Sequence, residues 1–179
     1  MKETTITSKT VFDGRILKFM HDEVELDDGT RAMREVVSHP GGVCIAPLDS
    51  ENNLLFVRQF RYPYREDVLE LPAGKLEKGS TPLENGKREL LEETGAVGWS
   101  YISLGQVYPT PGYTDEIIHL YACRIGELGE AKPDEGEFVN IEKIPLDRAV
   151  EMVLNNQVPD AKTQIAVLKT AMLLKSGKI

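Results

Sequence analysis

The chain has 179 residues, 28% of them charged, and a formal net charge of −8. These values are typical of one folded domain with room for a small added subdomain, and the excess of acids argues against sequence-independent nucleic-acid binding, which depends on basic surface. No stretch approaches the roughly 18 apolar residues of a membrane span, and the polar N-terminus lacks the apolar segment of a signal peptide. We therefore expect a cytoplasmic protein with no nucleic-acid partner and no membrane partner.

The first forty residues are predicted to form strands at 5–12, 15–26 and 31–39. The Asp-Gly step within 27–30 is a hairpin signal. We expect a small antiparallel β-subdomain over residues 1–40, followed by the main domain over 41–179.

The main domain is predicted to mix strands with three helices, which gives an α/β (α+β) fold with a mixed sheet covered by helices. The expected strands are 43–49, 53–60, 67–74, 101–108, 116–125 and 138–144, and the expected helices are 82–94, 145–156 and 161–177.

The two cysteines, Cys44 and Cys123, stand alone in apolar runs, without a CxxC pair or a histidine at metal-ligand spacing. We expect both to be buried free thiols. Zinc chemistry and Cys/His nucleophilic catalysis consequently have little support.

The helix predicted at 82–94 has clear signals at both ends. Thr81 and Glu84 form a capping-box pattern with Pro82 between them, and Gly95 stands where a C-terminal glycine belongs. At 100° per residue, one side of the helix could face a core, and the residues on that side are Leu83, Leu90, Thr94 and Val97.

Three acids, Glu89, Glu92 and Glu93, crowd the C-terminal part of this helix. Like charges at this spacing cost about 0.2–0.5 kcal/mol per pair, and acids near a helix C-terminus oppose its dipole. They could form a solvated face in which Arg88 pairs with Glu92. Alternatively, they could bind a divalent cation such as Mg²⁺ or Mn²⁺, which prefers carboxylate oxygens.

The segment from Gly74 to Ala96 resembles the Nudix box at fixed spacing. The matching residues are Gly74, Arg88, Glu89, Leu90, Glu92, Glu93 and Gly95, with Ala96 in the last, loosely aliphatic place. Ser80 departs from the pattern, which has Glu there. The resemblance favours the metal site over the solvated face and implies the Nudix fold, with its mixed sheet between helices.

The resemblance also implies a hydrolase that cleaves a nucleoside diphosphate linked to another group with Mg²⁺ or Mn²⁺, and more than one ion per site. Glu89 and Glu93 would be direct metal ligands, Glu92 a direct or water-bridged one, and the backbone carbonyl of Ala73 a further ligand. Arg88 would orient the glutamates.

Ser80 replaces a residue that usually lies in the outer shell of the metal, so its loss could weaken one ion site without removing the chemistry. Glu77 and Glu84 lie close in sequence and could partly substitute. The alternative is a degenerate box in a nucleotide-binding regulator with weak or no catalysis.

Beyond the box, nearly the whole chain resembles bacterial ADP-ribose pyrophosphatases, most clearly at Pro111 and Gly112 in "TPGYTDE" and in the segments "VRQFRYP", "MREVVSHPG" and "DAKT". This resemblance implies hydrolysis of ADP-ribose to AMP and ribose 5-phosphate by a homodimer. The implied substrate-binding residues are Arg61 at the phosphates, Arg58 as a weaker candidate there, Arg34 and Glu35 by the adenine or ribose, and Pro111 and Gly112.

The general base is expected on the acidic loop "KPDEGEFV", with Glu135 as first choice and Glu137 as second. Another substrate of the same type, such as a sugar nucleotide, NADH or a dinucleoside polyphosphate, is the alternative within the enzyme class.

Overall fold

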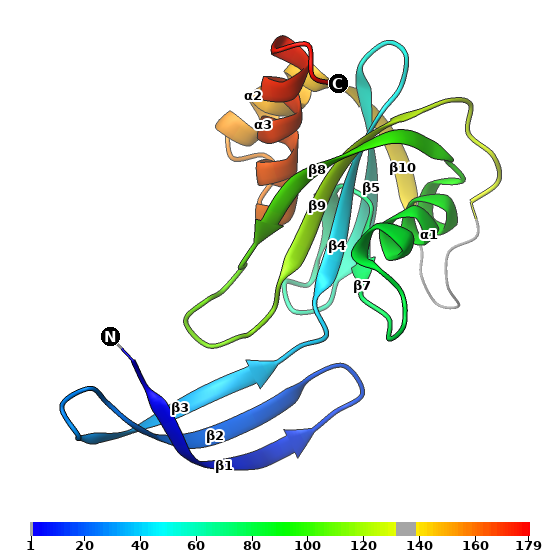
Figure 1. The fold of residues 1–179 in the computed structure, drawn as a ribbon. Coiled ribbons are helices and arrows are strands. Elements are labelled where there is room, and N and C mark those ends of the chain that lie inside the picture. The colour runs from blue at the N-terminus through cyan, green and yellow to red at the C-terminus, as the bar shows by residue number, and fades with distance from the viewer. Residues whose placement is uncertain (1, 132–138) are drawn as a thin grey trace. The chain divides into compact units, whose positions relative to one another are not determined.

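The computed structural model describes residues 2–131 and 139–179. Glu135 and Glu137, the two expected candidates for the base, lie outside the described residues. The chain divides into two compact units, one of Met1–Gly41 with Tyr108–Ile117 and one of Gly42–Val107 with Ile118–Ile179 (Figure 1).

The first unit contains an antiparallel sheet in the order β1 (Thr4–Asp13), β2 (Lys18–Glu25), β3 (Arg31–Ser38). The β2–β3 turn has Gly29 at φ 81°, and the Asp28 carboxylate accepts from the Thr30 backbone N–H at 2.9 Å. This arrangement confirms the predicted small antiparallel sheet and its Asp-Gly hairpin.

The first unit buries little of its apolar surface. Val24 alone is buried among the residues of its three strands, and every residue of β1 is exposed. The exposed large apolar residues of this unit include Ile6, Val11, Phe12, Ile16, Leu17 and Met33. A three-stranded sheet needs a covered apolar face for independent stability.

The second unit is built on a mixed sheet. Its main path runs β10 (Asn140–Pro145), β5 (Asn53–Arg61), β4 (Gly42–Leu48), β9 (Ile118–Ile125), β8 (Gly98–Val107), with β6 (Glu66–Glu70) on β5 and β7 (Ala73–Lys75) on β4. Strands β4 and β9 are parallel, whereas the other pairs in the described residues are antiparallel. The predicted mixed sheet is confirmed.

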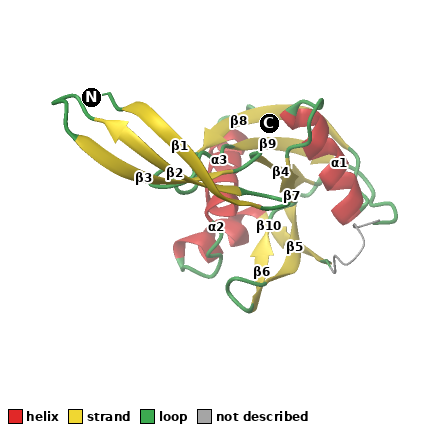
Figure 2. Ribbon diagram, turned by 90° about the horizontal axis from the view of Figure 1, so that it is seen from below, coloured by secondary structure: helices red, strands yellow, loops and turns green. Residues whose placement is uncertain are grey.

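Helices cover both faces of this sheet. Helix α1 (Pro82–Thr94) lies on one face, and α2 (Leu146–Leu154) and α3 (Ala161–Lys175) lie on the other (Figures 1 and 2). Successive β4 residues alternate between the two cores: Val43 and Ile45 pack with Leu90 of α1, while Cys44 and Ala46 pack with residues of α2 and α3. A strand covered on both faces is apolar throughout, as β4 is.

The strand predicted at 67–74 is in fact two strands. β6 ends at Glu70 and β7 begins at Ala73, because Pro72 has no backbone N–H for a sheet ladder. Here the chain leaves β5 and pairs with β4, with Ala73 opposite Cys44 and Gly74 opposite Val43. The break thus brings the start of the box segment to the beginning of β4.

The predicted buried stripe of α1 is wrong in part. Val97 is 68% exposed, because it follows the helix C-cap, and Leu83 is only partly buried. The buried residues of α1 are Asn85, Gly86, Leu90, Glu93 and Thr94. The helix therefore buries a glycine and three polar residues but only one large apolar side chain.

Both cysteines are buried and free, as expected. Over the described residues, no helix combines the length and apolar character needed to cross a membrane.

Candidate active site

The two capped ends of helix α1 fix the positions of its acidic residues. The Thr81 hydroxyl accepts from the Glu84 N–H at 3.3 Å, and the Glu84 carboxylate accepts from the Thr81 N–H at 2.7 Å. Gly95 has φ 69° and donates its N–H to the Leu91 carbonyl at 2.8 Å. The capping box and the C-cap glycine are confirmed, so the helix begins and ends where the sequence predicts.

The absence of a side chain at Gly74 leaves room for the Glu89 carboxyl group. A Cβ atom added at Gly74 would overlap the Glu89 carboxyl group, so the carboxylate lies in space that any other residue type at position 74 would fill. The glycine of β7 and the first acid of the cluster therefore belong to one packed arrangement.

Glu93 is almost fully buried, with 4% of its surface exposed. Its Oε2 accepts a hydrogen bond from the Ala73 backbone N–H at 3.2 Å. Ala73 and Glu93, two of the expected metal ligands, are thus adjacent although they lie on different elements. A buried carboxylate at this position is costly unless it is paired or binds a metal ion.

Arg88 contacts the other two acids. Its Nη2 lies 2.6 Å from Glu89 Oε1 and 3.2 Å from Glu77 Oε1, and its Nη1 bonds to Glu92. This is the geometry expected of a residue that orients glutamates. Over the described part of the chain, no three His, Cys, Asp or Glu side chains are grouped to hold a metal ion. Glu89 and Glu92 turn instead toward the Arg88 guanidinium, which satisfies their charge.

The structure separates the two acids proposed to replace the missing Glu at position 80. Glu84 is engaged in the capping box, whereas the largely exposed Glu77 reaches Arg88. Asn85, a buried residue that sequence reasoning missed, holds the intervening loop: its side chain accepts from the Glu77 N–H at 3.1 Å and donates to the Thr81 carbonyl at 2.8 Å. No sequence motif marks this asparagine.

Arg61 belongs to a buried charged cluster next to the box segment. Its Nε and Nη2 donate to the two oxygens of Glu70 at 2.6 and 2.8 Å, and Lys162 bonds to the same carboxylate. Burial alone would raise the pKa of Glu70, but the hydrogen bonds and charges of Arg61 and Lys162 hold it below its usual value. The sequence predicted Arg61 as a site residue and marked Lys162 only through the resemblance of the segment "DAKT", whereas nothing in the sequence singled out Glu70.

The remaining candidate in the second unit, Arg58, pairs with Glu142 of β10 at 2.6 Å. This cross-strand pair gives Arg58 a structural role whether or not it also contacts a substrate.

The candidates in the first unit lie on β3 and on the 108–117 segment. Arg34 pairs with Glu3 through two hydrogen bonds of 2.8 Å, and Glu35 is exposed on the same strand. Pro111 and Gly112 form an exposed turn. The flank of this turn is tied to β3, because the Val37 N–H donates to the Tyr113 carbonyl at 2.7 Å. Substrate contact by these four residues stays a prediction.

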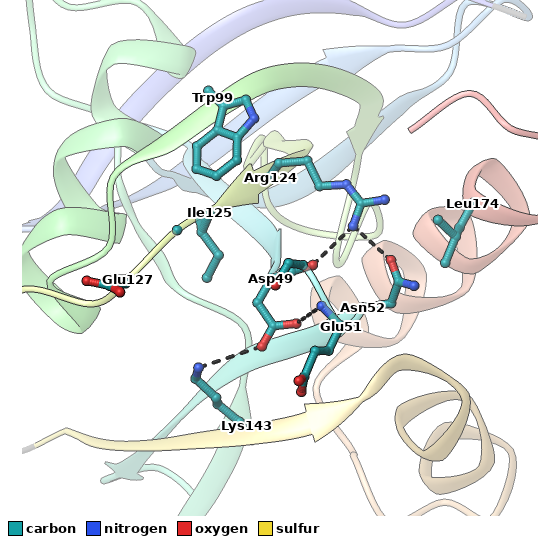
Figure 3. Close-up of a pocket in the computed structure, with 11 residues that line it drawn as sticks. Asp49, Glu51, Asn52, Trp99, Arg124, Ile125, Glu127, Lys143 and Leu174 are labelled. Carbon is teal, nitrogen blue, oxygen red and sulfur yellow. Dashed lines mark hydrogen bonds and ion pairs between the residues drawn. The ribbon is translucent and has the colours of Figure 1, made fainter.

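A separate pocket of about 700 Å³ lies at the β4–β5 turn, at the other end of β4 from its pairing with β7 (Figure 3). Arg124 holds this turn by donating to the Asp49 carbonyl at 3.1 Å and to Asn52 Oδ1 at 2.8 Å. No residue of the 74–96 segment is among its described lining, so the candidate active site is defined by the acids of α1 and not by this pocket.

A mixed sheet between helices, together with a helix whose acidic residues lie next to a glycine of β7, defines a Nudix hydrolase. The family model described as NUDIX domain matches residues 38–167, and the chain belongs to this family. The family resemblance of the box segment is thereby confirmed.

Three similar proteins extend this finding. The methanol dehydrogenase activator of Bacillus methanolicus is 40% identical over 93% of this chain and 91% of its own length. The ADP-ribose pyrophosphatase of Bacillus subtilis strain 168 is 37% identical over 93% of this chain and 91% of its own length. A crystal structure of an ADP compounds hydrolase matches the fold with a TM-score of 0.85 at 19% identity, over 100% of this chain and 98% of that one.

Proposed function

We propose that this Nudix hydrolase cleaves the pyrophosphate of ADP-ribose into AMP and ribose 5-phosphate with the help of Mg²⁺ or Mn²⁺. The observation that carries the proposal is the corner formed by Ala73, Gly74, Glu89 and Glu93, in which the buried Glu93 carboxylate accepts from the Ala73 N–H and the Glu89 carboxylate packs against the neighbouring Gly74. The 37% identity to the ADP-ribose pyrophosphatase of Bacillus subtilis supports the choice of substrate.

The carboxylates of α1 provide the oxygen donors that hard divalent cations prefer. The buried Glu93 and the Glu89 carboxylate over Gly74 offer oxygen ligands, and we assign Glu92 and the Ala73 carbonyl as further ligands. A divalent ion bound there would neutralise charge on a pyrophosphate and lower the pKa of a bound water. Arg88 would hold Glu89 and Glu92 in place, as its contacts with both already do.

Other residues would complete the reaction. We assign contact with the substrate phosphates to Arg61, whose side chain is 39% exposed, and proton abstraction from the attacking water to Glu135 or Glu137. We further propose that the protein is a homodimer, because the first unit leaves large apolar side chains exposed. A cytoplasmic location is part of the same proposal.

A second candidate function is favoured by the 40% identity to the methanol dehydrogenase activator of Bacillus methanolicus. In this alternative the protein would activate a methanol dehydrogenase, and its box would serve mainly to bind a nucleotide. Ser80 in the box is the sequence feature in its favour.

A substrate panel separates these functions. The protein is incubated with Mg²⁺ or Mn²⁺ and ADP-ribose, sugar nucleotides, NADH or diadenosine compounds, and the products are identified chromatographically. We expect AMP and ribose 5-phosphate from ADP-ribose at the highest kcat/KM. Stimulation of a methanol dehydrogenase without turnover of any compound in the panel would favour the second function.

Glu93→Gln tests the carboxylate chemistry of the corner. The amide oxygen can still accept from the Ala73 N–H, but the negative charge is lost, so we expect kcat for ADP-ribose to fall by at least about 100-fold with little change in thermal stability. Glu127→Gln, an exposed acid at the distant pocket, is the matched control. Full activity of Glu93→Gln would show that the ligand assignment is wrong.

A further inference from the structure

Four charged side chains from three elements form a cluster beside the box segment. Arg61 comes from the end of β5, Glu70 from the end of β6, and Asp160 and Lys162 from the start of α3. Lys162 Nζ bonds to Glu70 Oε2 and lies 2.9 Å from Asp160 Oδ1. Two cations and two anions balance, so the cluster, named here the four-charge cluster, carries no net charge.

The cluster is buried at its centre and open at Arg61. The exposed fraction of the side chain is 3% for Glu70 and 12% for Lys162 but 39% for Arg61. A buried ion pair is weak evidence for stability, because desolvation offsets the Coulomb attraction and well-packed apolar residues often serve as well. The burial of Lys162 against Glu70 therefore suggests a role other than stabilisation.

The arrangement orients the exposed guanidinium. Glu70 binds Nε and Nη2 of Arg61 in a two-point contact that fixes the guanidinium plane. Within residues 2–131 and 139–179, Nη1 of Arg61 has no hydrogen-bond partner. A guanidinium that is fixed at one edge, with Nη1 still available, is suited to binding a phosphate oxygen.

The four-charge cluster is connected to the box segment through residues 70–73. Glu70 precedes Ala73 by three positions, and between them the Leu71 N–H donates to the Thr163 hydroxyl of α3 at 2.9 Å. The Glu70 hydrogen bonds raise the pKa of Arg61, and the charges of Asp160 and Glu93 act in the same direction. Arg61 is therefore within electrostatic range of the buried acid of α1.

We propose that Lys162 and Asp160 are positioning residues that hold Glu70, and through it Arg61, so that the free edge of the guanidinium meets a phosphate oxygen of the substrate. The inference rests on the proposed hydrolysis of ADP-ribose. According to this inference, Asp160 and Lys162 at the start of α3, 64 and 66 positions after the end of the box segment at Ala96, contribute to substrate binding without touching the substrate.

A double-mutant cycle tests the positioning role with ADP-ribose and Mg²⁺. We expect Lys162→Met to raise KM about tenfold with kcat within about threefold of wild type, because a displaced Glu70 lets Arg61 move away from the phosphate. In an Arg61→Ala background the same change is expected to alter KM by less than about twofold, since the residue it acts through is absent. A merely structural role would give the same factor in both backgrounds.

Two further variants control for misfolding and for effects that are not specific to the four-charge cluster. Glu70→Gln combined with Lys162→Met removes one charge of each sign, keeps the remaining pair balanced, and is expected to give the same rise in KM. Lys143→Met makes the same substitution at a lysine that lies 3.6 Å from Asp49 at the distant pocket, and we expect an unchanged KM. Thermal unfolding of each variant verifies the fold.

An unchanged KM in folded Lys162→Met and in the charge-balanced double variant would overturn the positioning role, as would an equal effect in the Arg61→Ala background. Wild-type protein that binds ADP-ribose without hydrolysing it would overturn the proposed function alone. In that case the dissociation constant from calorimetry replaces KM in the same cycle. Wild-type protein that does not bind ADP-ribose would overturn both.

Discussion

The glycine at position 74 leaves a space that the Glu89 carboxyl group occupies. The obstacle that a side chain at this position would meet is the end of a flexible glutamate, which can turn away at small cost to stability. Glu89 is also held by Arg88 at 2.6 Å. A larger residue at position 74 would therefore displace the carboxylate that the metal site needs.

We expect Gly74→Ala to lower kcat/KM for ADP-ribose by about 10- to 100-fold, because a displacement of about 1 Å at a reacting centre can cost that much. The thermal midpoint is expected to change little. Gly126→Ala is a suitable control, since its added Cβ would meet Trp99 at an ordinary 3.5 Å. An unfolded Gly74→Ala variant, or one with normal activity, would contradict this account of the glycine.

Helix α1 packs closely on β4 because of a glycine inside the helix. A Cβ at Gly86 would lie 2.6 Å from Ile45 Cδ1 and 2.9 Å from Val43 Cγ2. Glycine costs about 1 kcal/mol relative to alanine in a helix interior, so the sequence gives up intrinsic helix stability to bring the acids of α1 near β7. The close approach also explains why Gly86 is among the buried residues of the helix.

Gly86→Ala is accordingly expected to destabilise the protein although it raises helix propensity. Overpacking of a core typically costs about 1–3 kcal/mol, and a net loss of about 1 kcal/mol would lower the thermal midpoint by roughly 2–4 °C. Ile45→Val removes the atom nearest to the new methyl group. The double variant is therefore expected to be at least as stable as Gly86→Ala alone, and scanning calorimetry that gave additive losses would contradict the steric explanation.

At the scale of the whole molecule, the first unit buries few apolar residues in the monomer. Phe12 is 57% and Ile16 46% exposed, and exposed apolar groups of this kind often mark an interface between proteins. A homodimer that covers these side chains would give the sheet of β1 to β3 the core that it otherwise lacks.

Sedimentation velocity should therefore show a dimer for the wild-type protein. Phe12→Ser combined with Ile16→Ser is expected to shift the population toward monomer at micromolar concentration, because the buried apolar area would be lost. Leu154→Ser, a change at an even more exposed apolar residue of α2 (69%), should leave the dimer intact. A monomeric wild type, or a dimer insensitive to the double change, would contradict the predicted interface.

The amino-acid sequence by itself determined the ends of α1, the spacing of its acids and the family. Those features depend on contacts within a few residues, such as the bonds between Thr81 and Glu84 or between Gly95 and Leu91. Such local patterns are visible without the fold. The two free cysteines and the mixed sheet were likewise predictable from apolar runs and turn residues.

Only the tertiary structure decided which groups meet at the site. Pro72 marks the break in the strand, but that the chain then pairs with β4 depends on the tertiary structure. Arg61 and Lys162 both bind Glu70, and Lys162 lies 92 positions from Glu70 in the sequence. No local pattern encodes such contacts, because they arise from packing helix α3 against one face of the sheet. For the same reason, the sequence identified the acids of α1 but not the cluster that we expect to hold Arg61 in place.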